Sequence, residues 1–177
     1  RNSMRKALLI IDLQNDYFPG GEYPLWNTDE TLSRIEQAVL AARKQGVLVI
    51  LVQHIANPEK GISPFFNKGT EGVDIHPAIL AVAPDAPVVV KEHADSFFHT
   101  ALGEVLDQNN VEELLVCGMM TQNCVTHTAI SKSAEKFKVS VLGDCCSSVD
   151  GMIHAIALNA LTSRIPVVDS SSVSWKE

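Results

Sequence analysis

A carboxylate, an ammonium and a thiol follow three apolar runs of this sequence, and together they have the groups that nucleophilic hydrolysis needs. Asp12 follows the run 7–11, Lys91 follows the run 88–90, and Cys124 lies in the loop after the run 113–118. A thiolate attacks an acyl carbon, a carboxylate moves protons, and a cation stabilises developing negative charge. Each residue alone also has an ordinary structural explanation, so the combination is what predicts chemistry.

The position of Cys124 predicts a reactive thiol. It lies at the start of an expected helix with Lys91 nearby, and both helix N-terminal amides and a neighbouring cation favour the thiolate. A free thiol has a pKa of about 8.5, so we expect a lowered pKa for Cys124 and a nucleophile at neutral pH. Backbone N–H groups of the same loop are candidates to hold a developing oxyanion.

The elements that must position these residues alternate short runs of Val, Ile and Leu with longer amphipathic segments, which is typical of helices around a parallel sheet. Strands are predicted over residues 6–12, 47–53, 87–91, 113–118, 138–142 and 165–168. One helix begins at a Thr28 or Asp29 cap and stops before Gly46, and others span about 98–108, 122–137 and 150–162. The sequence therefore predicts an α/β fold, a three-layer α/β/α sandwich with a central, mostly parallel six-stranded sheet.

Ligands of such sheets bind at the carboxyl ends of the strands, where Asp12, Lys91 and Cys124 fall. Neither a GxGxxG after the first strand nor a GxxxxGK[ST] nor a GxSxG is present, which excludes Rossmann dehydrogenases, P-loop NTPases and serine α/β-hydrolases. The segment 54–87 is long and rich in Pro and Gly, so we expect it to cover a pocket or an oligomer contact.

Length and composition bound the class of protein. The 177 residues, 46% of them hydrophobic and 20% charged, suit one globular domain, taken as residues 4–177, with 1–3 interpreted as an expression-tag remnant. The net charge of -7 disfavours nucleic acid, and no apolar run approaches the length of a membrane span. Four cysteines without CxxC or zinc-like spacing predict a reduced, cytoplasmic protein without a metal or another cofactor.

Several motifs in order along nearly the whole chain resemble the isochorismatase-like cysteine hydrolases, which include nicotinamidases and N-carbamoylsarcosine amidohydrolase. They are 7–18 (ALLIIDLQNDYF) with the turn 19–21, then 69–72 (GTEG), 75–77 (IHP), 90–91 (VK), 96–98 (SFF) and 118–125 (GMMTQNCV). The resemblance implies a catalytic triad of Asp12, Lys91 and Cys124. It also implies a cis peptide bond between Met119 and Met120, which turns the Met120 amide toward the substrate beside that of Cys124.

By the same resemblance, the reaction is a two-step acyl transfer on a small-molecule amide, carbamoyl or related C–N bond, and the protein forms dimers or tetramers. Nicotinamidases carry an Asp-x-His metal motif after the second strand. Here residues 52–57 read VQHIAN, so we expect no metal and treat His54 as a hydrogen-bonding group. Family members that hydrolyse the isochorismate vinyl ether can dispense with the thiol, so that activity stays the alternative.

Candidate pocket walls are the aromatic and loop residues near these strand ends: Phe18, Trp26, Phe65, Phe66, Phe98, Met119 and Thr121. Gln14 and His127 are weaker candidates. The adjacent pair Cys145 and Cys146 leaves open another class of protein, a thiol-based redox sensor, although packing under the next helix explains the pair equally. A binding protein without activity is the third alternative.

Overall fold

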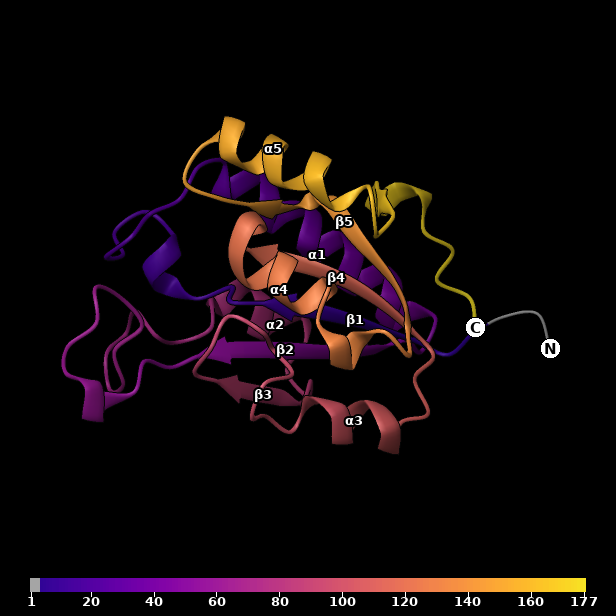
Figure 1. The fold of residues 1–177 in the computed structure, drawn as a ribbon, viewed down its shortest axis with the longest axis horizontal. Coiled ribbons are helices and arrows are strands. Elements are labelled where there is room, and N and C mark those ends of the chain that lie inside the picture. The colour runs from indigo at the N-terminus through magenta and orange to yellow at the C-terminus, as the bar shows by residue number, and fades with distance from the viewer. Residues whose placement is uncertain (1–3) are drawn as a thin grey trace.

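The computed structural model describes residues 4–177, and the interpreted tag remnant lies outside them. A six-stranded sheet forms the centre, with strand order β3-β2-β1-β4-β5-β6 and every neighbouring pair parallel. The strands are β1 (Lys6–Ile11), β2 (Leu48–His54), β3 (Val88–Lys91), β4 (Glu113–Met119), β5 (Lys138–Ser147) and β6 (Val167–Val168). The predicted sandwich is confirmed (Figure 1).

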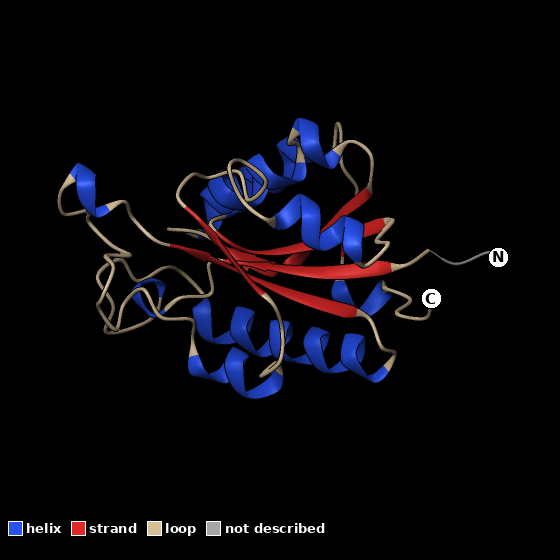
Figure 2. Cartoon of the chain, turned by 90° about the horizontal axis from the view of Figure 1, so that it is seen from below, coloured by secondary structure: helices blue, strands red, loops and turns tan. Residues whose placement is uncertain are grey.

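Helices cover both faces of the sheet (Figure 2). They are α1 (Thr28–Lys44), α2 (Pro77–Val82), α3 (Leu102–Gln108), α4 (Thr126–Ala129) and α5 (Gly151–Leu161). The chain steps outward from β1 to β3 and then from β4 to β6 in the opposite direction. Right-handed crossovers therefore place α1 and α2 on one face and the later helices on the other. Among residues 4–177, no helix is both long and apolar enough to cross a membrane.

The core is centred on β1, where all six residues are buried. This strand pairs with β2 on one side and β4 on the other, which explains its continuous apolar sequence. The C-terminus lies near the start of β1, at the end of the sheet opposite the carboxyl ends of β2 and β3 (Figure 1). Those carboxyl ends face the long loops, so the candidate residues at the strand ends lie on the side of the sheet where these loops are.

Three predicted helix boundaries are wrong. Asn27, in the left-handed region with φ of 57°, is the N-cap of α1, and neither Thr28 nor Asp29 is. The helix expected from 98 begins at Leu102. The helix expected over 122–137 is broken into a π-helical turn over Thr121–Val125, the short α4 and a 3-10 turn over Lys132–Ala134. Hydroxyl side chains that bond to nearby backbone compete with a continuous helix there.

Strand β5 continues to Ser147, beyond its predicted end at 142, so Asp144, Cys145 and Cys146 lie within the strand. Gly-Asp at 143–144 is typical of a turn, but here the register of β4 with β5 shifts between Val116 and Gly118, which accommodates the extra residues in the strand. Asp144 accepts hydrogen bonds from the backbone N–H and the hydroxyl of Ser170. The serine-rich stretch after β6 is thus docked against β5.

The segment between β2 and β3, residues 55–87, contains α2 and packs against the loop after β1; it is called the cover below. Asp16 ties this segment to the loop after β1: its Oδ2 accepts a hydrogen bond from the Phe66 N–H at 2.7 Å, while its Oδ1 accepts one at 3.1 Å from the N–H of Glu22 in its own loop. Gly72 packs so closely that a Cβ there would lie 2.0 Å from Asp16 Oδ1. Residues of the motif after β1 therefore position the cover, as well as the Asp12 carboxylate.

Candidate active site

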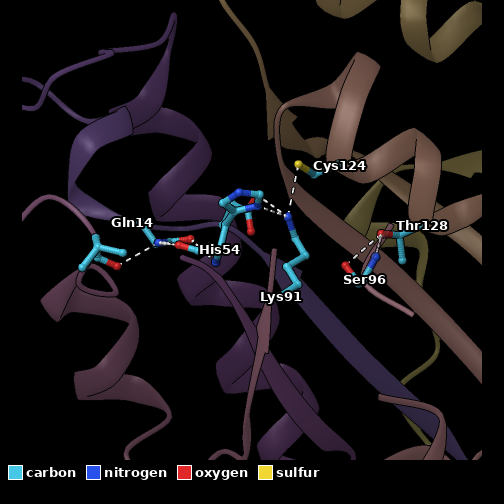
Figure 3. Close-up of polar contacts among 8 residues, drawn as sticks. Gln14, His54, Lys91, Ser96, Cys124 and Thr128 are labelled. Atoms are coloured by element: carbon cyan, nitrogen blue, oxygen red, sulfur yellow. Dashed lines mark hydrogen bonds and ion pairs between the residues drawn. The ribbon is translucent and has the colours of Figure 1, made fainter. Parts of the chain in front are cut away.

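The carboxyl ends of the central strands bring the three predicted residues together. Lys91 is the last residue of β3, Asp12 directly follows β1, and Cys124 lies in the turn after β4. The Lys91 Nζ is 3.1 Å from Asp12 Oδ2 and 3.4 Å from Cys124 Sγ. Figure 3 shows Lys91 and Cys124 pointing toward one another from different elements. The three groups have the proximity that hydrolysis requires.

A fourth side chain, His54 at the end of β2, completes the cluster. Its Nδ1 lies 2.8 Å from Lys91 Nζ, the shortest of the three lysine contacts (Figure 3). From the sequence, His54 is expected only to be a hydrogen-bonding group, and its contact with Lys91 is not predicted. The signal was the parallel register, because β2 and β3 are neighbours and His54 pairs with Lys91.

Asp12 occupies an uncommon backbone conformation. Its φ is 57°, in the left-handed region, and its N–H donates to the Val52 carbonyl at 3.0 Å. This conformation is tolerated by aspartate better than by most residues, and non-glycine residues held in it cluster at functional sites. Asp12 Oδ1 is buried and has no hydrogen-bond partner within residues 4–177. One oxygen is therefore held by Lys91 while the other is free to accept a proton.

The turn that carries Cys124 is fixed at both ends. Gly118 has φ of 120°, and a Cβ there would lie 2.1 Å from the Ile11 carbonyl oxygen, so only glycine fits. The peptide bond between Met119 and Met120 is cis, as expected. At the other end, the Thr126 hydroxyl donates to the Thr121 carbonyl at 2.6 Å. These contacts hold the thiol at the end of β4.

Burial dominates the electrostatics of the site. The Asp12 and Lys91 side chains are 0% exposed and Cys124 is 4% exposed. Burial, followed by the Asp12 charge, raises the pKa of the Cys124 thiol to about 12, although Lys91 acts in the opposite direction. The expected lowering of the thiol pKa is therefore wrong. The helix after Cys124 has four residues and offers little dipole, whereas desolvation disfavours the thiolate.

The same burial raises the pKa of Asp12, with Lys91 opposing it. Burial, then the Lys91 charge, lowers the pKa of His54 to about 3, so its ring is neutral at physiological pH. A protonated thiol beside a carboxylate of raised basicity is suited to proton transfer at the moment of attack. The cluster therefore favours a thiol that is activated by Asp12 over a preformed thiolate.

The candidate pocket residues are dispersed around this cluster. Phe18 is buried with its ring 4.4 Å from His76, and it lines a cavity of about 800 Å³ whose lining does not include the Asp12–Lys91–Cys124 cluster. Phe98 is exposed and stacks on His99, while Trp26 is exposed and contacts His154. The others are more deeply placed: Met119 and Thr121 are fully buried, and Phe65 and Phe66 pack on Tyr17.

Comparison with known proteins places the chain in a family. The family model described as the isochorismatase domain matches residues 6–172. The chain belongs to the isochorismatase family. This family of hydrolases includes a relative that is 38% identical over 145 residues, the uncharacterised isochorismatase family protein YddQ of Bacillus subtilis, covering 82% of this chain and 79% of the relative.

Two further similarities bear on the fold and the reaction of this isochorismatase-family hydrolase. Maleamate amidohydrolase of Pseudomonas putida is 29% identical over 154 residues, covering 80% of this chain and 71% of that protein. The structure of an isochorismatase family protein from Desulfovibrio vulgaris superposes with a TM-score of 0.87 at 26% identity, over 96% of each chain. The family resemblance and the fold inferred from sequence are both confirmed.

A resident metal does not fit the residues of this isochorismatase-family site. Asp12, His54 and Cys124 each offer a donor atom, and these atoms lie within 4.8 Å of one another. The Lys91 ammonium contacts all three, so a cation of the protein's own already occupies the space between them. The neighbouring residue Gln53 does not add a ligand to this cluster, because its side-chain Nε2 donates a hydrogen bond to the Val73 carbonyl at 3.0 Å.

Proposed function

We propose that this isochorismatase-family hydrolase cleaves a C–N bond of a small-molecule amide or carbamoyl compound, with Cys124 as nucleophile. The observation that carries the proposal is the shared Lys91 ammonium, which contacts both the Asp12 carboxylate and the Cys124 sulfur. The similarity to maleamate amidohydrolase supports an amide substrate. The thiol supports acyl transfer because a vinyl-ether hydrolysis does not require one.

In the first step, Asp12 accepts the thiol proton as Sγ attacks the carbonyl carbon. Lys91 stabilises the negative charge that is distributed over Asp12 and the sulfur, and the Met120 and Cys124 N–H groups are assigned to the oxyanion. Collapse of the tetrahedral intermediate breaks the C–N bond. Asp12 returns the proton to the departing ammonia or amine, which leaves a thioester on Cys124.

In the second step, water attacks the thioester while Asp12 accepts one of its protons. The C–S bond breaks, the acid product leaves, and the proton returns from Asp12 to the sulfur. Asp12 thus acts first as a base and then as an acid in each of the two steps, which suits a carboxyl group whose pKa is raised by burial. Lys91 keeps its proton throughout and supplies charge.

An ammonia-release screen over amides, carbamates and ureido acids tests the proposal. The wild-type protein is compared with Cys124→Ala and with Cys145→Ala, in which another buried thiol is removed. We expect turnover of at least one compound, a loss of about 10³-fold or more in Cys124→Ala, and little change in Cys145→Ala. Full turnover by Cys124→Ala would disprove the nucleophile, and release of pyruvate from isochorismate without any amide turnover would favour the vinyl-ether reaction.

A further inference from the structure

The Lys91 ammonium has three hydrogens and three acceptors. Besides Asp12 Oδ2 and Cys124 Sγ, it reaches His54 Nδ1 at 2.8 Å. An ammonium group only donates hydrogen bonds, so Nδ1 must be the unprotonated ring nitrogen and Nε2 carries the hydrogen. The shortest contact of the site cation is therefore to a neutral acceptor.

The His54 ring stays neutral across the range in which a hydrolase works. Burial lowers its pKa to about 3, and the neighbouring positive charge of Lys91 and His93 acts in the same direction, whereas Glu92 opposes it. Protonation would place two cations 2.8 Å apart. His54 consequently accepts from Lys91 at neutral and alkaline pH alike.

The backbone of His54 is clamped independently of Lys91. Gln14 Oε1 accepts a hydrogen bond from the His54 N–H, and Gln14 Nε2 donates to the His54 carbonyl, both at 2.8 Å. Figure 3 shows Gln14 beside His54, on the side away from Cys124. On another side, the Phe66 ring lies 5.8 Å from the imidazole, centroid to centroid. The fold itself therefore sets where Nδ1 lies.

We propose that His54 is a positioning residue, which holds the Lys91 ammonium between Asp12 and Cys124 so that the cation reaches the sulfur. This inference rests on the proposed role of Cys124. Asp12 is the ion-pair partner of Lys91 and, without a third acceptor, would draw the ammonium toward itself. The thiol would then lose the single cation that lowers its pKa. His54 acts through Lys91 and needs no contact with the substrate.

Alkylation of Cys124 by iodoacetamide tests this role without any substrate. The rate of modification is followed by peptide mass spectrometry from pH 7 to 9 in wild type, His54→Leu, His54→Asn and a control, His93→Leu. Asparagine can place an acceptor oxygen near the position of Nδ1, whereas leucine cannot. The Cys124→Ala protein gives the background from the other thiols.

We expect His54→Leu to react about tenfold more slowly at each pH, which corresponds to a thiol pKa about one unit higher. The alkylation rate of His54→Asn should recover to within about threefold of the wild-type rate, and the rate of His93→Leu should equal that of wild type. Equal rates in wild type and His54→Leu would overturn the proposal, as would His54→Asn reacting as slowly as His54→Leu. Urea unfolding of each variant separates these outcomes from loss of the fold.

This measurement stands apart from the hydrolysis screen. If the alkylation rates follow the expected order while no amide is cleaved, the positioning role holds and the proposed reaction fails. If amides are cleaved but His54→Leu alkylates and turns over as fast as wild type, the reaction holds and the positioning role fails. With a substrate in hand, His54→Leu should lower kcat and leave KM nearly unchanged.

Discussion

Asp12 and Lys91 form an ion pair with 3.1 Å between Oδ2 and Nζ, and neither side chain is exposed to solvent. Removing one partner of such a pair leaves an uncompensated buried charge, which typically costs about 3–5 kcal/mol. The pair is nearly neutral as a whole, so it adds little net field at the neighbouring sulfur. The Cys124 thiol stays protonated in spite of a lysine at 3.4 Å chiefly because burial raises its pKa, and the Asp12 charge adds to that effect.

Replacement of Asp12 by Asn should change two rates of Cys124 in opposite directions. Hydrolysis should fall by at least about 10²-fold, because no group then accepts the thiol proton. Alkylation of Cys124 at pH 8 should become several-fold faster, because the Asp12 charge no longer raises the thiol pKa. Ammonia release and iodoacetamide kinetics on the same preparation measure both. A parallel fall of the two rates would contradict the role of Asp12 as a base.

Gly118→Ala should destabilise the fold. The added Cβ would lie 2.1 Å from the Ile11 carbonyl oxygen, and φ of 120° is unfavourable for alanine. We expect the free energy of unfolding to fall by about 3 kcal/mol or more. Gly103→Ala in α3 is the matched control, because open space surrounds that position and alanine favours a helix by about 0.5–1 kcal/mol. Urea denaturation measures both, and similar effects from the two variants would refute the close approach of β4 to β1.

Stability should decrease at alkaline pH. Burial raises the pKa of Cys124 and of Cys145 to about 12 from an ordinary value of 9.0. Above pH 9 the unfolded chain loses these protons while the folded chain retains them, so the stability present below pH 9 is lost as pH rises toward 12. The slope is at most about 1.4 kcal/mol per pH unit for each thiol. Urea denaturation at pH 8, 9 and 10 in reducing buffer should show this fall, and Cys145→Ala should make it shallower. A flat profile would show that these thiols ionise alike in both states.

Asp16→Ala should loosen the cover between β2 and β3. The Phe66 N–H would lose its carboxylate acceptor, and a lost hydrogen bond to a charged group costs about 1.5–3 kcal/mol. Hydrogen exchange of residues 63–73 should accelerate at least tenfold. Asp74→Ala changes an exposed carboxylate of the same segment and should leave exchange as in wild type. Faster exchange in both variants would indicate that the segment is mobile whatever holds it.

The sequence predicted the sandwich because its strands are nearly continuous apolar runs, and β1 is the clearest example. Helix boundaries were harder to predict where polar side chains or unusual backbone conformations change the local structure. Asn27 adopts a left-handed conformation at the start of α1, and Thr126 bonds to the Thr121 carbonyl where a regular helix was expected. Such hydrogen bonds depend on neighbours that a periodic pattern does not reveal.

For the site, residue types and the expected parallel strands predicted that Asp12, Lys91 and Cys124 lie close together, because the carboxyl ends of parallel strands meet at one edge of the sheet. The thiol pKa could not be predicted in the same way, because desolvation depends on how tightly the folded chain packs around the sulfur. His54 was missed as a partner of Lys91 because strand order alone does not give register. Once β2 and β3 are known to pair His54 with Lys91, their contact is expected.

The contacts of Trp26 make its fluorescence a means to follow ligand binding in this hydrolase. The indole ring lies 5.7 Å from the His154 ring, whose Nδ1 lies 2.7 Å from the hydroxyl of Thr121, at the start of the turn that carries Cys124. A ligand that displaces this turn would move the His154 ring relative to the indole and so change the surroundings on which the emission of Trp26 depends. With Trp175 replaced by Phe, the emission of Trp26 would follow occupancy in real time, so binding could be observed for compounds that the enzyme never turns over.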